Sequence, residues 1–278
     1  MQLTNKQKVL LFVIIIVSAA GLLTLIRSGK ALGTKTLSVQ TPAPTPSEIT
    51  AFKTITPPPN VLNSPSPAPK LSKNSYTIAL FGDSMIDTMG DMKYLNDALT
   101  KKYPETKFNL YNYGIGAQNV QKGLDRLISS FSYMGREYPS LKDINADVII
   151  FGTFAYNPFE NHDVARYANT LTNLITQTKS FNKKIYLLIE IAPLGDKFGL
   201  GPHGINWPPD LTIKQSQHID EQLSAAREVA KNLQVPIVDV YSHTKKTTMY
   251  TNVDDGIHPS YDGAVLTANL IAKTIILK

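Results

Sequence analysis

The alternation of short apolar runs with amphipathic segments organises the chain from residue 75 onward. Five runs rich in β-branched and aromatic residues show no apolar/polar alternation. The segments that follow them carry apolar residues every three to four positions, which is the period of a helix with one buried face. The predicted strands are residues 76–81, 108–112, 148–151, 185–191 and 237–240.

These predicted strands alternate with predicted helices, which is typical of an α/β domain. Strands that are buried on both faces read as continuous apolar runs, so we expect a parallel sheet with helices on both sides. In such folds the functional residues lie where strands end and helices begin. The predicted helices are residues 94–103, 120–131, 164–181, 219–233 and 264–277.

The start of the chain has a different pattern. Residues 9–26 carry no charge over 18 positions. As a helix they would span about 27 Å, close to the ~30 Å hydrocarbon core of a bilayer. We expect an uncleaved transmembrane signal-anchor at 9–26, after a tail at 1–8; the alternative is a signal peptide cleaved near VSAAG. Basic residues flank this segment almost equally on both sides, so charge alone does not fix its orientation.

A stretch rich in Pro, Thr and Ser separates the apolar segment from the α/β region. Nine of the chain's 18 prolines lie within residues 42–69. Such a sequence cannot bury a core, and we expect residues 27–74 to form an extended, disordered linker. A stalk of this kind after an anchor suits a domain, 75–278, on the extracytoplasmic side of the cell membrane. We therefore predict a single-pass membrane protein.

Charge excludes nucleic acid as the expected partner. The chain has 28 basic and 22 acidic residues, a net charge of +6, but residues 1–74 hold eight of the basic residues and one acid. The remaining 20 basic and 21 acidic residues leave residues 75–278 close to neutral. The positive charge thus flanks the apolar segment and gives the domain no nucleic-acid footprint. The chain has no cysteine, which excludes disulfides, thiolate metal sites and a cysteine nucleophile.

Two polar clusters at the ends of predicted strands indicate nucleophilic catalysis. The first strand ends in Gly-Asp-Ser, which makes Ser84 a candidate nucleophile. Near the C-terminus, DDGIHPS places Asp255 three residues before His258 in a loop tightened by Gly and Pro. At that spacing a carboxylate can reach Nδ1 of the histidine and leave Nε2 to accept a proton from a serine hydroxyl. Asp254 is adjacent and is the alternative partner for His258.

At these clusters the sequence resembles the SGNH, or GDSL-type, serine hydrolase family. FGDSMID matches its nucleophile block, with Met85 where the family name has Leu, and DGIHPS matches its last block. The resemblance covers residues 76–278 and implies a three-layer α/β/α, flavodoxin-like fold with about five parallel strands. It also implies acyl transfer: Ser84 attacks an ester carbonyl, His258 acts as the base and Asp255 orients His258.

The middle blocks of the family supply an oxyanion hole and match this sequence less well. The resemblance implies three donors: the nucleophile's own backbone N–H, that of a glycine after the second strand, and the amide of an asparagine after the third. In NYGIGAQN we choose Gly116, with Gly114 and Ala117 as alternatives. In GTFAYN the asparagine lies beyond the position that the family's GxND would give it. We choose Asn157, with Asn161 in reserve.

A Gly- and Pro-rich excursion, residues 193–210, follows the fourth predicted strand and holds the only tryptophan. Long loops at strand ends often form lids or binding walls, so Trp207 and His203 are candidate substrate-binding residues. An aromatic plug that contacts no ligand is the alternative for Trp207. The other histidines lack paired metal-ligand spacing, and we expect neither a metal nor another cofactor.

The anchor, the stalk and the resemblance together predict a serine esterase that removes acetyl or short acyl groups from cell-envelope or extracellular carbohydrate. A lysophospholipase-like lipid esterase and a carbohydrate O-acyltransferase are alternatives within the same chemistry. A non-catalytic glycan-binding module of the envelope is the alternative from a different class, and the altered third block favours it. The expected partners are an ester substrate and the membrane.

Overall fold

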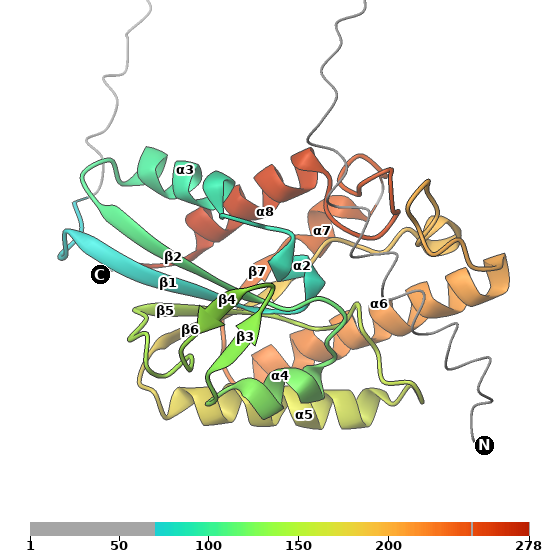
Figure 1. Ribbon diagram of the computed structural model, residues 1–278, viewed down its shortest axis with the longest axis horizontal. Coiled ribbons are helices and arrows are strands. Elements are labelled where there is room, and N and C mark those ends of the chain that lie inside the picture. The colour runs from blue at the N-terminus through green and yellow to red at the C-terminus, as the bar shows by residue number, and fades with distance from the viewer. Residues whose placement is uncertain (1–69, 246, 278) are drawn as a thin grey trace, which may run out of the picture. The chain divides into compact units, whose positions relative to one another are not determined.

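The computed structural model describes residues 70–277 except 246, and these form a three-layer α/β/α domain (Figure 1). The central sheet has five parallel strands in the order β2-β1-β5-β6-β7, the flavodoxin-like order. Each strand contains most of one predicted apolar run, so the predicted fold class and sheet are confirmed. The strands are β1 (Ser75–Gly82), β2 (Lys107–Gly114), β5 (Val148–Gly152), β6 (Lys184–Ile189) and β7 (Ile237–Asp239).

Helices cover both faces of this sheet, which explains its continuous apolar strands. All five residues of β5 and the last five of β1 are buried. Figure 1 shows α3 and α8 on one face, and α4, α5 and α6 on the other. The helices are α3 (Lys93–Lys102), α4 (Val120–Arg126), α5 (Val164–Lys179), α6 (Pro209–Asn232) and α8 (Tyr261–Thr274), with the single turns α2 (Ser84–Asp87), η1 (Gly195–Lys197) and α7 (Tyr241–Thr244).

The predicted helix at 120–131 was too long. Helix α4 ends at Arg126, and the chain then forms an antiparallel hairpin of β3 (Phe131–Tyr133) and β4 (Arg136–Tyr138). Met134 and Gly135 have φ of 49° and 73°, as a two-residue hairpin turn requires. The rings of Phe131 and Tyr138 stack across the two strands with their centroids 4.8 Å apart. Cross-strand aromatic packing therefore overrides a helical pattern that is apolar at the right spacing.

Helix α6 begins ten residues before the predicted start at 219. Pro209 opens it, where a missing N–H costs nothing and the fixed φ suits a helix. Its first turns bury Thr212 and Ser216 in place of large apolar residues. The hydroxyl of Ser216 accepts the N–H of Gly195 at 2.9 Å. Because polar residues occupy the buried face here, the apolar period that would predict a helix is missing from these turns.

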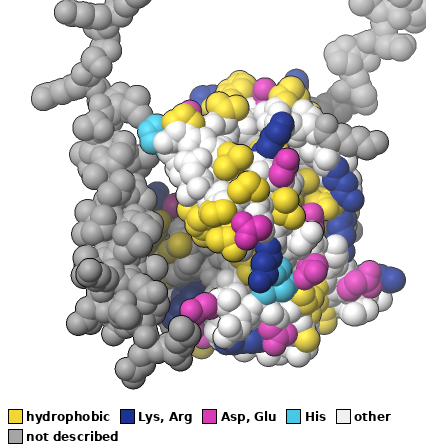
Figure 2. Space-filling view, turned by 90° about the vertical axis from the view of Figure 1, so that its right-hand side faces the viewer, with side chains coloured by type: hydrophobic (Ala, Val, Ile, Leu, Met, Phe, Trp, Pro, Cys, Tyr) yellow, Lys and Arg dark blue, Asp and Glu magenta, His cyan; other side chains and the backbone are white. Residues whose placement is uncertain are grey.

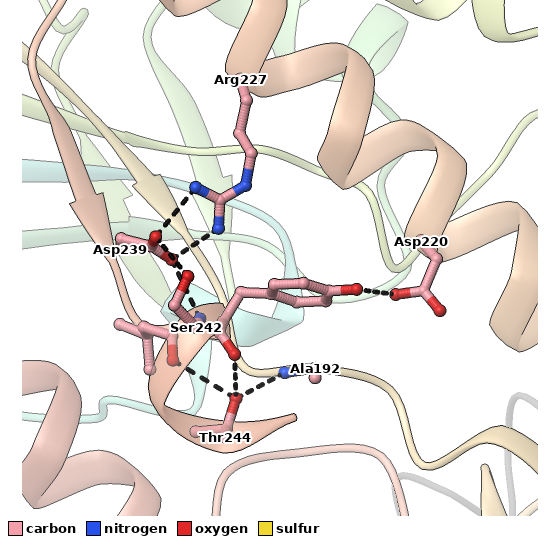
Figure 3. Close-up of polar contacts among 8 residues, drawn as sticks. Ala192, Asp220, Arg227, Asp239, Ser242 and Thr244 are labelled. Atoms are coloured by element: carbon pink, nitrogen blue, oxygen red, sulfur yellow. Dashed lines mark hydrogen bonds and ion pairs between the residues drawn. The ribbon is translucent and has the colours of Figure 1, made fainter. Parts of the chain in front are cut away.

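A polar network fixes α6, β7 and α7 to one another near the end of the sheet (Figure 3). Arg227 of α6 makes two hydrogen bonds to Asp239, at 2.9 and 2.6 Å, and Asp239 also accepts the backbone N–H of Ser242 in α7 at 3.0 Å. Burial opposes the ionised form of Asp239, but these hydrogen bonds prevail and lower its pKa to about 2. The hydroxyl of Thr244 accepts the N–H of Ala192 at 2.8 Å and so ties α7 to the chain beyond β6.

Within the described residues, no helix is both long and apolar enough to cross a membrane. The expected tail, anchor and nearly all of the expected linker, residues 1–69, lie outside the described part of the chain. The partition of the chain into these segments stays a prediction.

Candidate active site

The candidate nucleophile lies where β1 ends and α2 begins. Ser84 is the first residue of α2 and is partly exposed, while Asp83 before it is the N-cap and is fully buried. One carboxyl oxygen of Asp83 accepts the N–H of Met85 at 3.0 Å. This cap forces the chain to leave the strand at Ser84, at the carboxyl edge of the sheet. Figure 2 views the molecule from the right-hand side of Figure 1, where hydrophobic side chains gather among acidic and basic ones.

Asp255 and His258 form the predicted pair. The Nδ1 atom of His258 lies 2.8 Å from the Asp255 carboxylate. The same carboxylate accepts the backbone N–H groups of Ile257 and His258, at 2.7 and 3.0 Å. Burial opposes ionisation of Asp255, but its hydrogen bonds with His258 and with the two N–H groups lower its pKa below the ordinary value. Asp254 is exposed and makes no side-chain contact with His258, so the structure selects Asp255 as the partner.

The loop that carries His258 lies close to α2. Met85, next to Ser84, and Pro259, next to His258, line the same cavity of about 20 Å³. Burial raises the pKa of Asp83, and the bonds from Asn157 and Met85 and the nearby His258 oppose that rise. Among the described residues, neither Ser84 Oγ nor His258 Nε2 has a hydrogen-bond partner. Both groups are therefore available to a substrate or to each other.

The three candidate backbone donors after β2 have different surroundings. The N–H of Gly114 donates to Asn112 Oδ1 at 2.9 Å, and that of Gly116 donates to the hydroxyl of Tyr133 at 3.2 Å. Ala117 has a φ of 57°, a conformation that favours glycine. Its N–H has no partner within the part of the chain that the structure describes. Of the three, Ala117 thus has the free donor, while our first choice, Gly116, has one that a substrate would have to take from Tyr133.

The asparagine after β5 reaches the nucleophile block. The Asn157 amide donates to the second carboxyl oxygen of Asp83 at 2.9 Å, and one of its two N–H bonds remains for another acceptor. Asn161 is exposed and makes no such contact. The position that GxND would give to asparagine is occupied by Phe154, which has a φ of 61° and a fully buried ring. Of the two candidate asparagines, Asn157 alone contacts the nucleophile block.

The Gly- and Pro-rich excursion packs against the loop of Asp255 and His258. The N–H of His203 donates to Asp254 O at 2.7 Å, and that of Gly199 donates to Gly256 O at 3.0 Å. A Cβ at Gly201 would lie 2.4 Å from Asp254 O, so the two backbones touch where only glycine fits. The His203 side chain is exposed, and Trp207 is 40% exposed. The structure therefore gives the excursion a bracing role and leaves both candidate binding side chains facing solvent.

Two polar residues near the site escaped the sequence analysis. Arg126 of α4 is 8% exposed and donates to Gly82 O at 2.8 Å and Tyr113 O at 3.0 Å, so it joins the ends of β1 and β2. Burial lowers its pKa to about 9, and the nearby Asp83 carboxyl opposes that shift. Tyr133 of the hairpin donates to Asp87 at 3.0 Å as well as accepting from Gly116. Arg126 is the one basic residue on the buried face of α4, and this position on the helix is the only feature of the sequence that could have indicated its role.

Among the described residues, the remaining histidines make no hydrogen bond, ion pair or ring contact with Asp255 or His258. His162 and His218 stack with ring centroids 3.8 Å apart, and His162 also contacts Glu221 at 2.7 Å. Burial, followed by the neighbouring His162, lowers the pKa of His218. In residues 70–277 there is no group of three or more His, Cys, Asp or Glu side chains that could hold a metal ion.

The structure resembles solved hydrolases. A lipase/acylhydrolase from Enterococcus faecalis is 20% identical, with a TM-score of 0.54 over 71% of this chain and 94% of that chain. Axe2, an acetylxylan esterase from Geobacillus stearothermophilus, is 16% identical, with a TM-score of 0.53 over 73% and 95% of the two chains. The acetyl xylan esterase AlAXEase is 16% identical, with a TM-score of 0.53 over 72% and 100%. At these identities the likeness shows a common fold.

The sequence comparisons reach further. No curated protein matches the chain. The family model for GDSL-like lipase/acylhydrolases matches residues 78–271, which is more than half of the chain and includes both the Gly-Asp-Ser block and the Asp255–His258 loop. The chain belongs to the GDSL-like lipase/acylhydrolase family, as the sequence resemblance implied, and is a carboxylic ester hydrolase.

Proposed function

We propose that the chain cleaves acetyl or short acyl esters by nucleophilic catalysis at Ser84. His258 takes the Ser84 proton through Nε2 as the hydroxyl attacks the ester carbonyl, and Asp255 holds the ring through Nδ1. The tetrahedral intermediate collapses with loss of the alcohol, to which His258 gives the proton. Water then attacks the acyl-enzyme by the same route and releases the acid.

The observation that carries this proposal is the Asp255–His258 pair, with Nδ1 occupied at 2.8 Å and Nε2 without a partner among the described residues. An imidazole in this arrangement is held in the tautomer that accepts a proton at Nε2. The free hydroxyl of Ser84 stands at the start of a helix on the same edge of the sheet. Catalytic hydrogen bonds often form only in the substrate complex, so the pair needs no preformed bond to Ser84.

The oxyanion would bind to backbone N–H groups at Ser84 and after β2, with the remaining N–H of Asn157 as a side-chain donor. Gly116 donates to Tyr133, whereas Ala117 has a free N–H, which favours Ala117 as the backbone donor. Removal of one such donor from an oxyanion hole typically lowers turnover about 10²- to 10³-fold.

The substrate we propose is an acylated carbohydrate of the cell envelope or the extracellular space. Two structural neighbours are named acetylxylan esterases, and the predicted anchor at 9–26 and linker would hold the domain outside the membrane. A lipid ester or acyl transfer to a sugar hydroxyl would use the same Ser84 chemistry, and the product profile separates them.

Ester hydrolysis by the full-length chain tests this function. We expect p-nitrophenyl acetate turnover that falls at least about 1,000-fold in S84A and in H258A, because the Ser84 hydroxyl and the His258 imidazole act together in the same step. Circular dichroism should show that both variants stay folded. Turnover that survives in S84A would contradict Ser84 as the nucleophile, whereas a folded wild-type chain that is inert to esters and acylated oligosaccharides would favour the glycan-binding alternative.

A further inference from the structure

A buried acid lies directly after β6 and takes no part in the chemistry above. Glu190 is 4% exposed, and both of its carboxyl oxygens contact one residue, Thr153. The N–H of Thr153 donates to one oxygen at 2.6 Å, and its hydroxyl bonds the other. In the described residues Glu190 has no ion pair with a basic group. Burying a carboxyl group that only one neutral residue contacts costs free energy, so we expect Glu190 to have a structural or functional role.

Thr153 opens the segment that ends in Asn157. At its other end Tyr156 donates its hydroxyl to Ile191 O at 2.8 Å, so two successive residues after β6 hold both ends of this turn. Within it Phe154 adopts a φ of 61°, which is unfavourable for a bulky residue and persists only where surrounding contacts impose it. The Glu190 contacts therefore help to impose the turn that carries Asn157 to Asp83, 2.9 Å away.

We propose that Glu190, as a protonated carboxylic acid, is a positioning residue that fixes the turn from Thr153 to Asn157 and thereby holds Asn157 and Asp83 beside Ser84. This role rests on the proposed function of Ser84. The acid form suits the contacts, because the carbonyl oxygen accepts the Thr153 N–H while the O–H and the Thr153 hydroxyl can satisfy each other.

The charges around Glu190 favour this acid form. Burial, followed by the nearby carboxyl of Asp83, raises the pKa of Glu190 to about 8 against the opposing bonds to Thr153. Asp83, Tyr156 and Tyr167 are the titratable groups that face Glu190. The other walls, from α2 and α8, contribute no titratable side chain to the cavity that Glu190 lines. His258 and Arg126 act on Asp83.

Ionisation of Glu190 would place a negative charge beside the carboxyl of Asp83 and so disfavour the developing oxyanion at Ser84. Activity should therefore fall as the pH rises through the titration of Glu190. E190Q keeps a carbonyl oxygen for the Thr153 N–H and an amide N–H for its hydroxyl, but cannot ionise. E190A removes both contacts and leaves the Thr153 N–H buried without a partner.

The test is the pH–rate profile of the full-length chain for p-nitrophenyl acetate, corrected for spontaneous hydrolysis. At about pH 6 we expect E190Q to keep kcat within about threefold of wild type and E190A to lose at least about tenfold in kcat, with a smaller change in KM. Wild type should lose activity above about pH 8, and E190Q should not. An E190Q profile that coincides with the wild-type profile, or an E190Q as impaired as a folded E190A, overturns the proposal.

Thermal unfolding supplies a readout that does not depend on activity. Since folding raises the pKa of Glu190, the folded chain retains a proton that the unfolded chain releases, and wild-type stability falls as the pH rises between the two pKa values. The stability of wild type relative to E190Q should thus decline from about pH 5 to about pH 8. A constant difference overturns the proposal. If the wild type shows the decline but hydrolyses no ester, the buried neutral acid stands while its role in catalysis and the proposed function fail.

Discussion

Ser84 and the Asp255–His258 pair lie on one edge of the sheet but are held by different kinds of structure. Ser84 follows a strand whose last five residues are buried, and regular elements surround it: Asn112 of β2 donates to the carbonyls of Ile86, Asp87 and Gly90 and thereby fixes α2. Asp255 and His258 lie in a loop whose main support is another loop, through backbone contacts at Gly201 and Gly256.

This difference separates stability from catalytic geometry. The contacts around α2 belong to the sheet and its core, so damage there should lower the stability of the whole domain. The contacts between the two loops bury few apolar side chains, and Leu200, Ile205 and Val253 within them are exposed. Damage in the loops should instead move Asp255 and His258 while the core stays intact.

Among variants outside the three candidate catalytic residues, the largest effect on activity is expected from G201A. Its new Cβ would lie 2.4 Å from the backbone oxygen of Asp254, so one loop must shift. A displacement of about 1 Å in the Asp255–His258 loop can lower kcat by about 10²-fold. The measurement is kcat for p-nitrophenyl acetate together with the melting temperature, which should change little.

The matched control for G201A is G135A in the hairpin turn. Gly135 has a φ of 73° and nothing within 4 Å of an added Cβ, so this variant carries backbone strain without a clash. It should keep kcat within about twofold while losing about 1 kcal/mol of stability. Equal losses of activity in both variants would contradict a bracing role for the excursion.

In contrast to G201A in the loops, N112A beside α2 should lower the stability of the domain. It removes three hydrogen bonds to carbonyls near α2 and the acceptor for the Gly114 N–H. Buried groups left without partners cost about 1–3 kcal/mol each, and because Asn112 is half-buried we expect a loss of about 2 kcal/mol in the free energy of unfolding. Urea unfolding measures it. A loss of activity in N112A without a loss of stability would contradict the expectation that contacts around α2 act mainly on stability.

The smallest effect on the core chemistry is expected from W207A. Trp207 is 40% exposed, and no ring contact of its side chain exists among the described residues. Turnover of p-nitrophenyl acetate and the melting temperature should stay close to wild type. If Trp207 stacks on a sugar, KM for acetylated xylo-oligosaccharides should rise by about fivefold or more, in line with the loss of about 1 kcal/mol of aromatic contact. An unchanged KM would assign Trp207 no role in binding.

The sheet, the Gly-Asp-Ser block and the Asp255–His258 loop could be predicted because each depends on local sequence. A strand buried on both faces must be continuously apolar, and the three-residue spacing of Asp255 and His258 allows their contact within one loop. Gly116 and Asn157 were harder, because their donors depend on what packs against them. Tyr133, whose hydroxyl accepts the Gly116 N–H, comes from a hairpin that the sequence analysis did not predict.

Glu190 and Arg126 could not be predicted from local sequence, since Thr153 lies 37 residues from Glu190 and Gly82 lies 44 residues from Arg126 along the chain. A lone acid after a strand and a lone arginine on a helix look like surface residues until the fold buries them. Only the packing of α4 against β1 and β2, and of β6 against β5, gives each its partners.

Labelling of the full-length chain with a fluorophosphonate, followed by mass spectrometry of its peptides, tests directly whether Ser84 is the nucleophile. The reagent requires a serine activated by a base. We predict a single adduct on Ser84 that is absent in S84A and strongly reduced in H258A. A folded wild-type chain that remains unlabelled, or one labelled at another serine, would contradict the assignment of Ser84 as the nucleophile.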